Sequence, residues 1–145
     1  MTKSKQPLVS VIIPAYNAQD YIGDAINSVL EQTYKNIEVI IIDDKSTDET
    51  SKIAATYAKN DKRIIFIKND QNLGIGGNRS KGLELAKGEY ICWQDADDIS
   101  IPDRIEKQVD VLESKPKAGV VGGWLQFFSN EGEGAVRKYS ADDKE

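Results

Sequence analysis

The sequence contains no histidine among its 145 residues. This absence excludes a Ser-His-Asp triad, a Cys-His pair and a His-ligated zinc site. The single cysteine, Cys92, excludes an internal disulfide and indicates a reducing compartment such as the cytoplasm. No apolar run is long enough to span a bilayer, and residues 1–7 lack the apolar core of a secretory signal. We therefore expect no transmembrane segment, and any general base must be a carboxylate, a lysine, a tyrosine or Cys92.

Basic residues are fewer than acidic ones. The 19 Lys and Arg residues are outnumbered by 24 Asp and Glu residues, so the formal net charge is −5. A broad nucleic-acid-binding face is therefore not expected. Acidic clusters instead suit a hard divalent cation such as Mn²⁺ or Mg²⁺, which prefers oxygen ligands. The length and the 39% of hydrophobic residues are typical of one soluble domain spanning residues 1–145.

Strand-like and helix-like patterns alternate along the chain. Short, largely apolar runs predict strands at 8–13, 39–42, 64–67 and 90–93, and the first two are expected to be buried. Apolar residues at helical spacing predict a helix at 21–30, and another helix is predicted at about 76–86. A capping box at Ser46 and Glu49 predicts a helix after 46, and Pro102 at a first helical position predicts one after 102. Further strands are predicted at 118–121 and 124–128, and 129–145 is expected to be a polar tail or hairpin. This order predicts an α/β, Rossmann-like fold with a mostly parallel sheet and helices on both faces.

Unusual polar residues follow three of these strands. Pro14 to Asn17 follow the first, Asp43 and Asp44 the second, and Asp95 to Asp98 the fourth. The carboxyl ends of parallel strands meet at one edge of a sheet, where ligands bind in such folds. An isolated Asp-rich turn is more often a solvated helix cap. Asp95 to Asp98, however, follow a buried strand and lie at the same edge as a second acidic pair. This position favours a ligand site that binds a cation.

Other candidates are open to two interpretations. Tyr16 could stack on a nucleobase or pack at the edge of the core, and Arg79 could neutralise a diphosphate, pair with a carboxylate or lie on the surface. The glycines at 74, 76 and 77 predict a tight turn and do not match a dinucleotide-binding fingerprint. Cys92 lies in a predicted strand and is interpreted as buried and unreactive. The aromatic residues at 124, 127 and 128 are expected in a core or at a subunit or subdomain contact.

Four ordered motifs together resemble the family 2 glycosyltransferases with the A-type nucleotide-sugar fold. They are residues 9–17, 42–50, 72–74 and 88–98. The resemblance implies an inverting transferase that uses a nucleotide-activated sugar, a UDP-sugar in particular, and a divalent cation. Its acceptor would be a saccharide or a lipid-linked molecule. The location implied is the cytoplasm, with peripheral contact to the inner face of a membrane.

The resemblance also implies roles for individual residues. Pro14, Ala15 and Tyr16 would line the base pocket, and Asp44 would accept a hydrogen bond from the base. Asp97 would hold the cation, and Asp95 would contact the ribose or a cation-bound water. The nucleotide-sugar site would also include Gly74, Arg79 and Ala96.

The family places its general base, an Asp or Glu, in a segment after the donor-binding half. No such motif is recognisable up to Glu145. We therefore interpret the chain as a truncated, donor-binding half whose base lies beyond Glu145, and we expect it to transfer sugar poorly. A nucleotide-sugar-binding module without transferase activity is the main alternative. A haloacid dehalogenase phosphatase and a response-regulator receiver are disfavoured, because both need their acidic residues after the first strand.

Overall fold

The computed structural model describes residues 6–129 and 132–138. The chain divides into two compact units, Met1–Ile105 and Glu106–Glu145. Each unit is described by itself. The first unit contains every residue that the sequence predicts to bind a ligand, and its sheet sets their positions.

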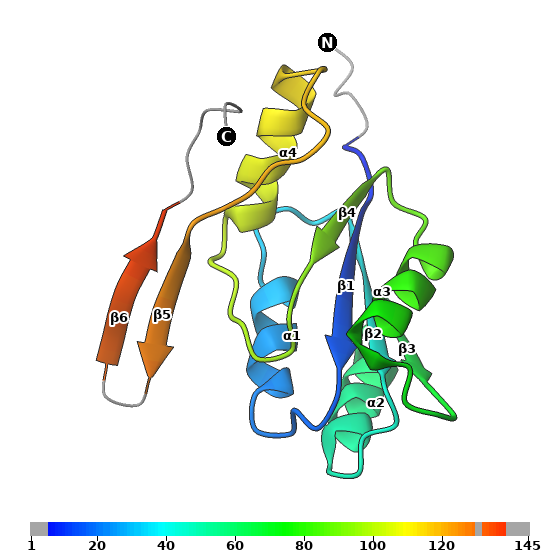
Figure 1. Ribbon diagram of the computed structural model, residues 1–145. Coiled ribbons are helices and arrows are strands. Elements are labelled where there is room, and N and C mark those ends of the chain that lie inside the picture. The colour runs from blue at the N-terminus through cyan, green and yellow to red at the C-terminus, as the bar shows by residue number, and fades with distance from the viewer. Residues whose placement is uncertain (1–5, 130–131, 139–145) are drawn as a thin grey trace. The chain divides into compact units, whose positions relative to one another are not determined.

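The first unit is built on a four-stranded sheet (Figure 1). Its strands are β1 (Val9–Ala15), β2 (Ile37–Asp43), β3 (Ile64–Lys68) and β4 (Tyr90–Trp93), in the order β3-β2-β1-β4. Every neighbouring pair is parallel. The predicted α/β fold with a mostly parallel sheet is confirmed, and all four strand predictions lie within about two residues of the observed bounds.

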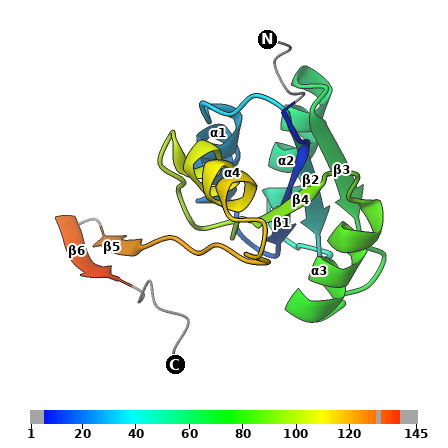
Figure 2. The ribbon, with the colours of Figure 1, turned by 90° about the horizontal axis from the view of Figure 1, so that it is seen from above.

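Three helices cover this sheet. They are α1 (Ile22–Leu30), α2 (Thr50–Asn60) and α3 (Gly74–Leu85). Helices α1 and α2 lie together on one face, whereas α3 lies on the other (Figure 2). A parallel sheet needs such cover on both faces, because each crossover between parallel strands leaves a helix against it.

The core explains the continuous apolar runs. Every residue of β1 is buried, and so is nearly every residue of β2. Ile12, Ile40 and Ile42 form a fully buried cluster with Leu85 and Trp93 packed against it. A Cβ atom at Gly82 would clash with Ile12, so glycine lets α3 lie directly on the sheet. Cys92 is buried as predicted, and burial raises the pKa of its thiol, which makes it a poor nucleophile.

The capping-box prediction at Ser46 and Glu49 is wrong. Helix α2 begins at Thr50, whose N–H donates to Asp48. The Ser46 hydroxyl is used elsewhere, because it accepts a hydrogen bond from the N–H of Asn17. A contact between two loops therefore takes the place of the expected local cap.

Two other predicted helix bounds differ from the observed ones. Helix α3 begins at Gly74 and not near Gly76, because the N–H of Gly74 donates to a buried carboxylate. Helix α4 (Arg104–Ser114) begins after Pro102. The carbonyl of Pro102 accepts a hydrogen bond from Thr33, so this residue belongs to the connection before the helix. Among the described residues, no helix has the length and apolar character needed to cross a bilayer.

The second unit contains the rest of α4 and an antiparallel hairpin. The hairpin pairs β5 (Leu125–Ser129) with β6 (Gly132–Arg137). The strand predicted at 118–121 is wrong, because Val120 is 89% exposed and no described strand pairs with this segment. The predicted aromatic residues Trp124, Phe127 and Phe128 are exposed, so they form no core in the described chain. Residues 139–145 of the predicted tail lie outside the described residues.

Candidate functional site

The candidate site lies where the strand order reverses. The chain passes from β1 to β2 and β3 on one side, then returns to β4 on the other side of β1. The loops that leave the carboxyl ends of β1 and β4 therefore diverge and leave a crevice between them. Ligands bind at such reversal points in parallel sheets.

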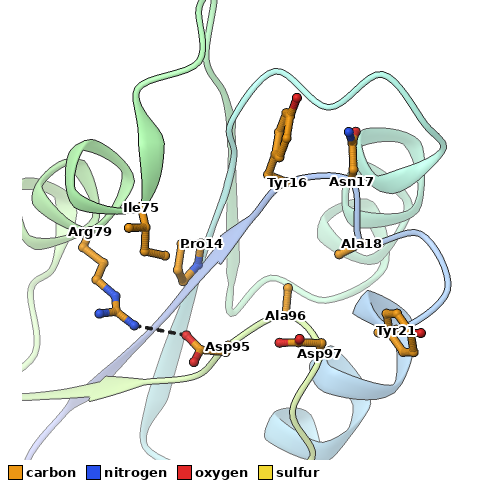
Figure 3. A pocket seen from close by; sticks show the side chains of 10 residues that line it. All are labelled: Pro14, Tyr16, Asn17, Ala18, Tyr21, Ile75, Arg79, Asp95, Ala96 and Asp97. Atoms are coloured by element: carbon orange, nitrogen blue, oxygen red, sulfur yellow. Dashed lines mark hydrogen bonds and ion pairs between the residues drawn. The ribbon is translucent and has the colours of Figure 1, made fainter.

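A pocket of about 410 Å³ occupies this position (Figure 3). Ligand pockets commonly have volumes of about 300–1,000 Å³. Six predicted site residues line it: Pro14, Tyr16, Arg79, Asp95, Ala96 and Asp97. Four other residues complete the lining: Asn17, Ala18, Tyr21 and Ile75. Of the other predicted site residues, Ala15, Asp44 and Gly74 are not part of the lining. The structure thus brings together the loops after β1 and β4 and the first half of α3, whereas the predicted loop at Asp43 and Asp44 does not line the pocket.

The loop after β1 is fixed by the loop after β2. Asn17 adopts a positive φ of 48°, which places its side chain across the gap between the loops. Its Oδ1 accepts hydrogen bonds from Thr47, and its N–H donates to Ser46. The N–H of Ala18 donates to Thr50 at 2.7 Å. These contacts hold the backbone beside Tyr16, whose ring remains 53% exposed at the pocket.

Two carboxylates of the loop after β4 reach the pocket. Asp95 and Asp97 are both exposed, whereas Ala96 between them is buried. Arg79 donates to Asp95 Oδ1 at 3.1 Å (Figure 3). Its guanidinium lies 5.2 Å from the centre of the Trp93 ring. The oxygen atoms of Asp95 and Asp97 match the ligand preference of Mn²⁺ and Mg²⁺. No group of three or more candidate metal-ligating side chains occurs in the described residues, so a cation here would need ligands from substrate or water.

The acidic loop concentrates negative charge. Burial raises the pKa of Asp98, and the negative charges of Asp95 and Asp97 raise it further. Arg104 opposes this effect but does not reverse it. Like charges crowded into one turn favour a nearby positive charge, and Arg79 meets this need in part through its contact with Asp95.

Asp44 occupies a different environment. It is 2% exposed, and its Oδ1 accepts hydrogen bonds from Asn69 and from the N–H of Leu73. Its Oδ2 accepts from the N–H of Gly74 at 2.8 Å, so this carboxylate stabilises the start of α3. A carboxylate has about four acceptor positions, and one on Oδ2 remains. The predicted contact between Asp44 and a base stays a prediction.

Asp43 has no direct place in the pocket lining. It is fully buried, and its Oδ1 accepts from the N–H of Ser46 at 3.3 Å. Its Oδ2 has no hydrogen-bond partner among the described residues. Asp43 thus supports the loop after β2.

Comparison with known proteins decides the family. The glycosyl transferase family 2 profile matches residues 10–142. The chain belongs to this family. The parallel sheet with its flanking helices is the A-type fold of glycosyltransferases, as the resemblance implied.

Relatives of this family 2 chain include proteins with a named role and solved structures. A putative teichuronic acid biosynthesis glycosyltransferase, TuaG of Bacillus subtilis, is 46% identical over 74% of this chain and 42% of its own. S. aureus TarS 1-349 in complex with UDP-GlcNAc is 29% identical, with a TM-score of 0.68 over 73% of this chain and 31% of that one. The mannosyltransferase PcManGT of Pyrobaculum calidifontis, solved with GDP-Man and Mn²⁺, is 26% identical, with a TM-score of 0.73 over 80% of this chain and 35% of that one.

The family 2 chain is short beside these relatives. It spans 44%, 38% and 42% of the lengths of three curated glycosyltransferases that it matches. All the loops that line the pocket fall within the matched residues 10–142.

Sequence reasoning missed several buried polar residues near the acidic loop and Asp44. Gln94 is 2% exposed and directly precedes the acidic loop, and Gln32 is fully buried below the same loop. Asn69 and Asn78 are buried beside Asp44. A glutamine or asparagine carries no charge or spacing signal, so only its position next to a strand end could have drawn attention to Gln94.

Proposed function

We propose that this chain binds a nucleotide-sugar donor, a UDP-sugar in particular, as the donor-binding part of a metal-dependent inverting glycosyltransferase. The observation that carries the proposal is the pocket between β1 and β4, which combines an exposed tyrosine, an arginine and two carboxylates. TarS, which is similar to this chain, was solved with UDP-GlcNAc.

The acceptor is proposed to be a saccharide or a lipid-linked molecule. TuaG, at 46% identity, is named a putative teichuronic acid biosynthesis glycosyltransferase. A lipid-linked acceptor would be reached at the inner, cytoplasmic face of a membrane. This part of the proposal rests on the relatives, because the predicted site residues of the pocket are all assigned to the nucleotide-sugar donor and the cation.

The predicted site residues would each contact a different part of the donor. Tyr16 offers an exposed ring on which a base can stack, with Pro14 and Ala15 forming the adjacent backbone. Asp44 would accept the base N–H at its remaining Oδ2 position, with Gly74 beside it. Arg79 would exchange its contact with Asp95 for the donor diphosphate, because a guanidinium binds phosphate oxygens well.

Asp95 and Asp97 would hold Mn²⁺ or Mg²⁺. When bound, the cation supplies positive charge that stabilises the nucleoside diphosphate as the glycosidic bond breaks. PcManGT was solved with Mn²⁺, which supports this assignment. Ala96 between the two carboxylates has a side chain small enough for close approach of the donor.

An inverting displacement also needs a base for the proton of the acceptor hydroxyl. Histidine is absent from the chain, so no imidazole of this chain serves as that base. Asp95 and Asp97 are assigned to the cation and the donor. We therefore assign no residue of the pocket to this role.

Calorimetric titration tests the donor proposal. UDP, GDP and UMP are titrated into the chain with and without Mn²⁺. We expect UDP to bind at least about tenfold more tightly with Mn²⁺, whereas UMP, which lacks the second phosphate, gains less. Equal affinities for UDP with and without the cation would contradict the proposal.

A second experiment addresses transfer. The chain is incubated with Mn²⁺, a panel of UDP-sugars and saccharide acceptors, and the products are separated by mass. Glycoside formation would support a complete transferase. Binding without product agrees both with a donor-binding part that lacks the base and with the alternative of a nucleotide-sugar-binding module.

A further inference from the structure

Gln94 links the two ends of the acidic turn. Its side-chain amide Nε2 donates to the carbonyl of Asp95 at 3.2 Å and to the carbonyl of Asp98 at 2.7 Å. The N–H of Asp98 also donates to the carbonyl of Asp95 at 3.2 Å. One buried side chain therefore sets the distance between the backbone positions on either side of Ala96 and Asp97.

The other end of the same amide is also held. Gln94 Oε1 accepts hydrogen bonds from the Ser100 hydroxyl and from Arg104 Nη1 at 3.0 Å. Arg104 in turn donates to the carbonyl of Trp93 at 2.9 Å, at the end of β4. All four hydrogen-bonding positions of the glutamine amide are thus used. A rotated amide would direct its NH₂ group at Arg104, so the orientation of Gln94 is determined.

We propose that Gln94 is a positioning residue that holds the Asp95–Asp98 backbone so that the Asp95 and Asp97 carboxylates face the pocket as a cation-binding pair. Gln94 does not line the pocket and acts only through this backbone. The inference rests on the proposed function, because it assigns the cation to Asp95 and Asp97.

Gln32, which follows α1, provides a matched control because its side chain bonds to the same loop. It is fully buried, like Gln94, and its Nε2 donates to the carbonyls of Ser28 and Ile101. Its Oε1 accepts from the N–H of Ile105. Both glutamines therefore cross-link the connection between β4 and α4, but Gln32 holds its far part and makes no contact with the acidic turn in the described structure.

The experiment compares Gln94→Met with Gln32→Met. Methionine keeps the length and the neutrality of glutamine but removes its hydrogen bonds. For each variant and for the unmodified chain, the affinity for UDP is measured with and without Mn²⁺, and thermal unfolding is recorded. The ratio of the two affinities isolates the contribution of the cation from general loss of stability.

We expect both variants to lower the melting temperature. Gln94→Met should lower the affinity ratio by about tenfold, the scale on which supporting residues alter metal binding, and should leave cation-free UDP binding within about twofold. Gln32→Met should keep the ratio within about twofold of the unmodified chain. An unchanged ratio in Gln94→Met, or an equal fall in both variants, would overturn the inference.

A milder variant covers the case in which Gln94→Met does not fold. Ser100→Ala removes one hydrogen bond to Gln94 Oε1 and retains the glutamine. We expect a fall of about threefold in the affinity ratio, equivalent to about 0.6 kcal/mol, and no change at all would overturn the inference. If the unmodified chain shows no effect of Mn²⁺ on UDP binding, the proposed function itself fails, and this is seen before any variant is compared.

Discussion

Acidic residues follow both strands that flank β1, yet their carboxylates have different surroundings. After β2, Asp44 is 2% exposed and accepts three hydrogen bonds from Asn69 and the start of α3. After β4, Asp95 and Asp97 are exposed at the pocket, and the contact of Asp95 is an exposed ion pair with Arg79. The same residue type at the same edge of the sheet thus supports the fold in one loop and faces a ligand pocket in the other.

This difference shows what separates a structural carboxylate from one available to a ligand. The order of the strands predicts that both acidic pairs lie at one edge of the sheet. The number of protein hydrogen-bond donors around each carboxylate oxygen then determines whether it supports the fold or is available to a ligand. A buried carboxylate must satisfy its acceptors within the protein, whereas an exposed one exchanges water for a ligand at low cost. Variants at the two loops should therefore affect different measurements.

The largest expected effect is on stability. Asp44→Ala leaves the N–H groups of Leu73 and Gly74 and the amide of Asn69 without their acceptor. We expect the free energy of unfolding to fall by about 3 kcal/mol, measured by urea denaturation. Asp95→Ala, which removes an exposed ion pair, should cost less than about 0.5 kcal/mol. Equal losses in the two variants would break the comparison.

The next effect is on ligand binding. Asp97→Ala should remove most of the Mn²⁺-dependent affinity for UDP, a loss of about 2 kcal/mol, because few protein ligands are available to the cation. The matched control is Asp70→Ala, which removes another exposed carboxylate just after β3. Calorimetry should show the loss in Asp97→Ala only. A similar loss in the control would assign the effect to net charge and not to the acidic loop.

A subtler change tests whether Asp44 also contacts the base. Asp44→Asn keeps the size of the side chain but replaces one acceptor oxygen by a donor. We expect uridine nucleotides to bind about 1.5 kcal/mol more weakly, and a nucleotide whose base lacks the matching N–H to lose less. Equal losses for all bases would restrict Asp44 to its support of α3.

The smallest effect concerns Asp61, a carboxylate of intermediate exposure. Hydrogen bonds from the Arg63 side chain lower the pKa of Asp61 to about 2 from 3.8. Since the pKa is lower in the folded state, the stabilisation is present above about pH 4 and is lost as the pH falls towards 2. We expect Asp61→Asn to cost about 1 kcal/mol at pH 7 and to weaken the acid-induced loss of stability. Acid titrations followed by circular dichroism would measure both; an unchanged acid transition would contradict the pairing.

Local patterns account for what was predictable from the sequence. The continuous apolar residues of β1 and β2 indicate burial on both faces, and the parallel order then places the loops after β1, β2 and β4 at one edge. The strand expected at 118–121 failed because an apolar run forms a strand only when a partner is available. The roles of Asp44 and Gln94 depend on hydrogen-bond partners up to 30 positions away in sequence, and no local pattern records them.

The contact between the loops after β1 and β2 bears on attempts to change the donor. Asn17 and Ala18 form hydrogen bonds with residues of the segment 46–50. Lys45, directly before that segment, has a positive φ of 62°. A graft of the Tyr16 loop from a relative would lose these partners unless the loop after β2 came with it. The loops after β1 and β2 therefore depend on each other, and an engineered chimera should take both loops from the same relative.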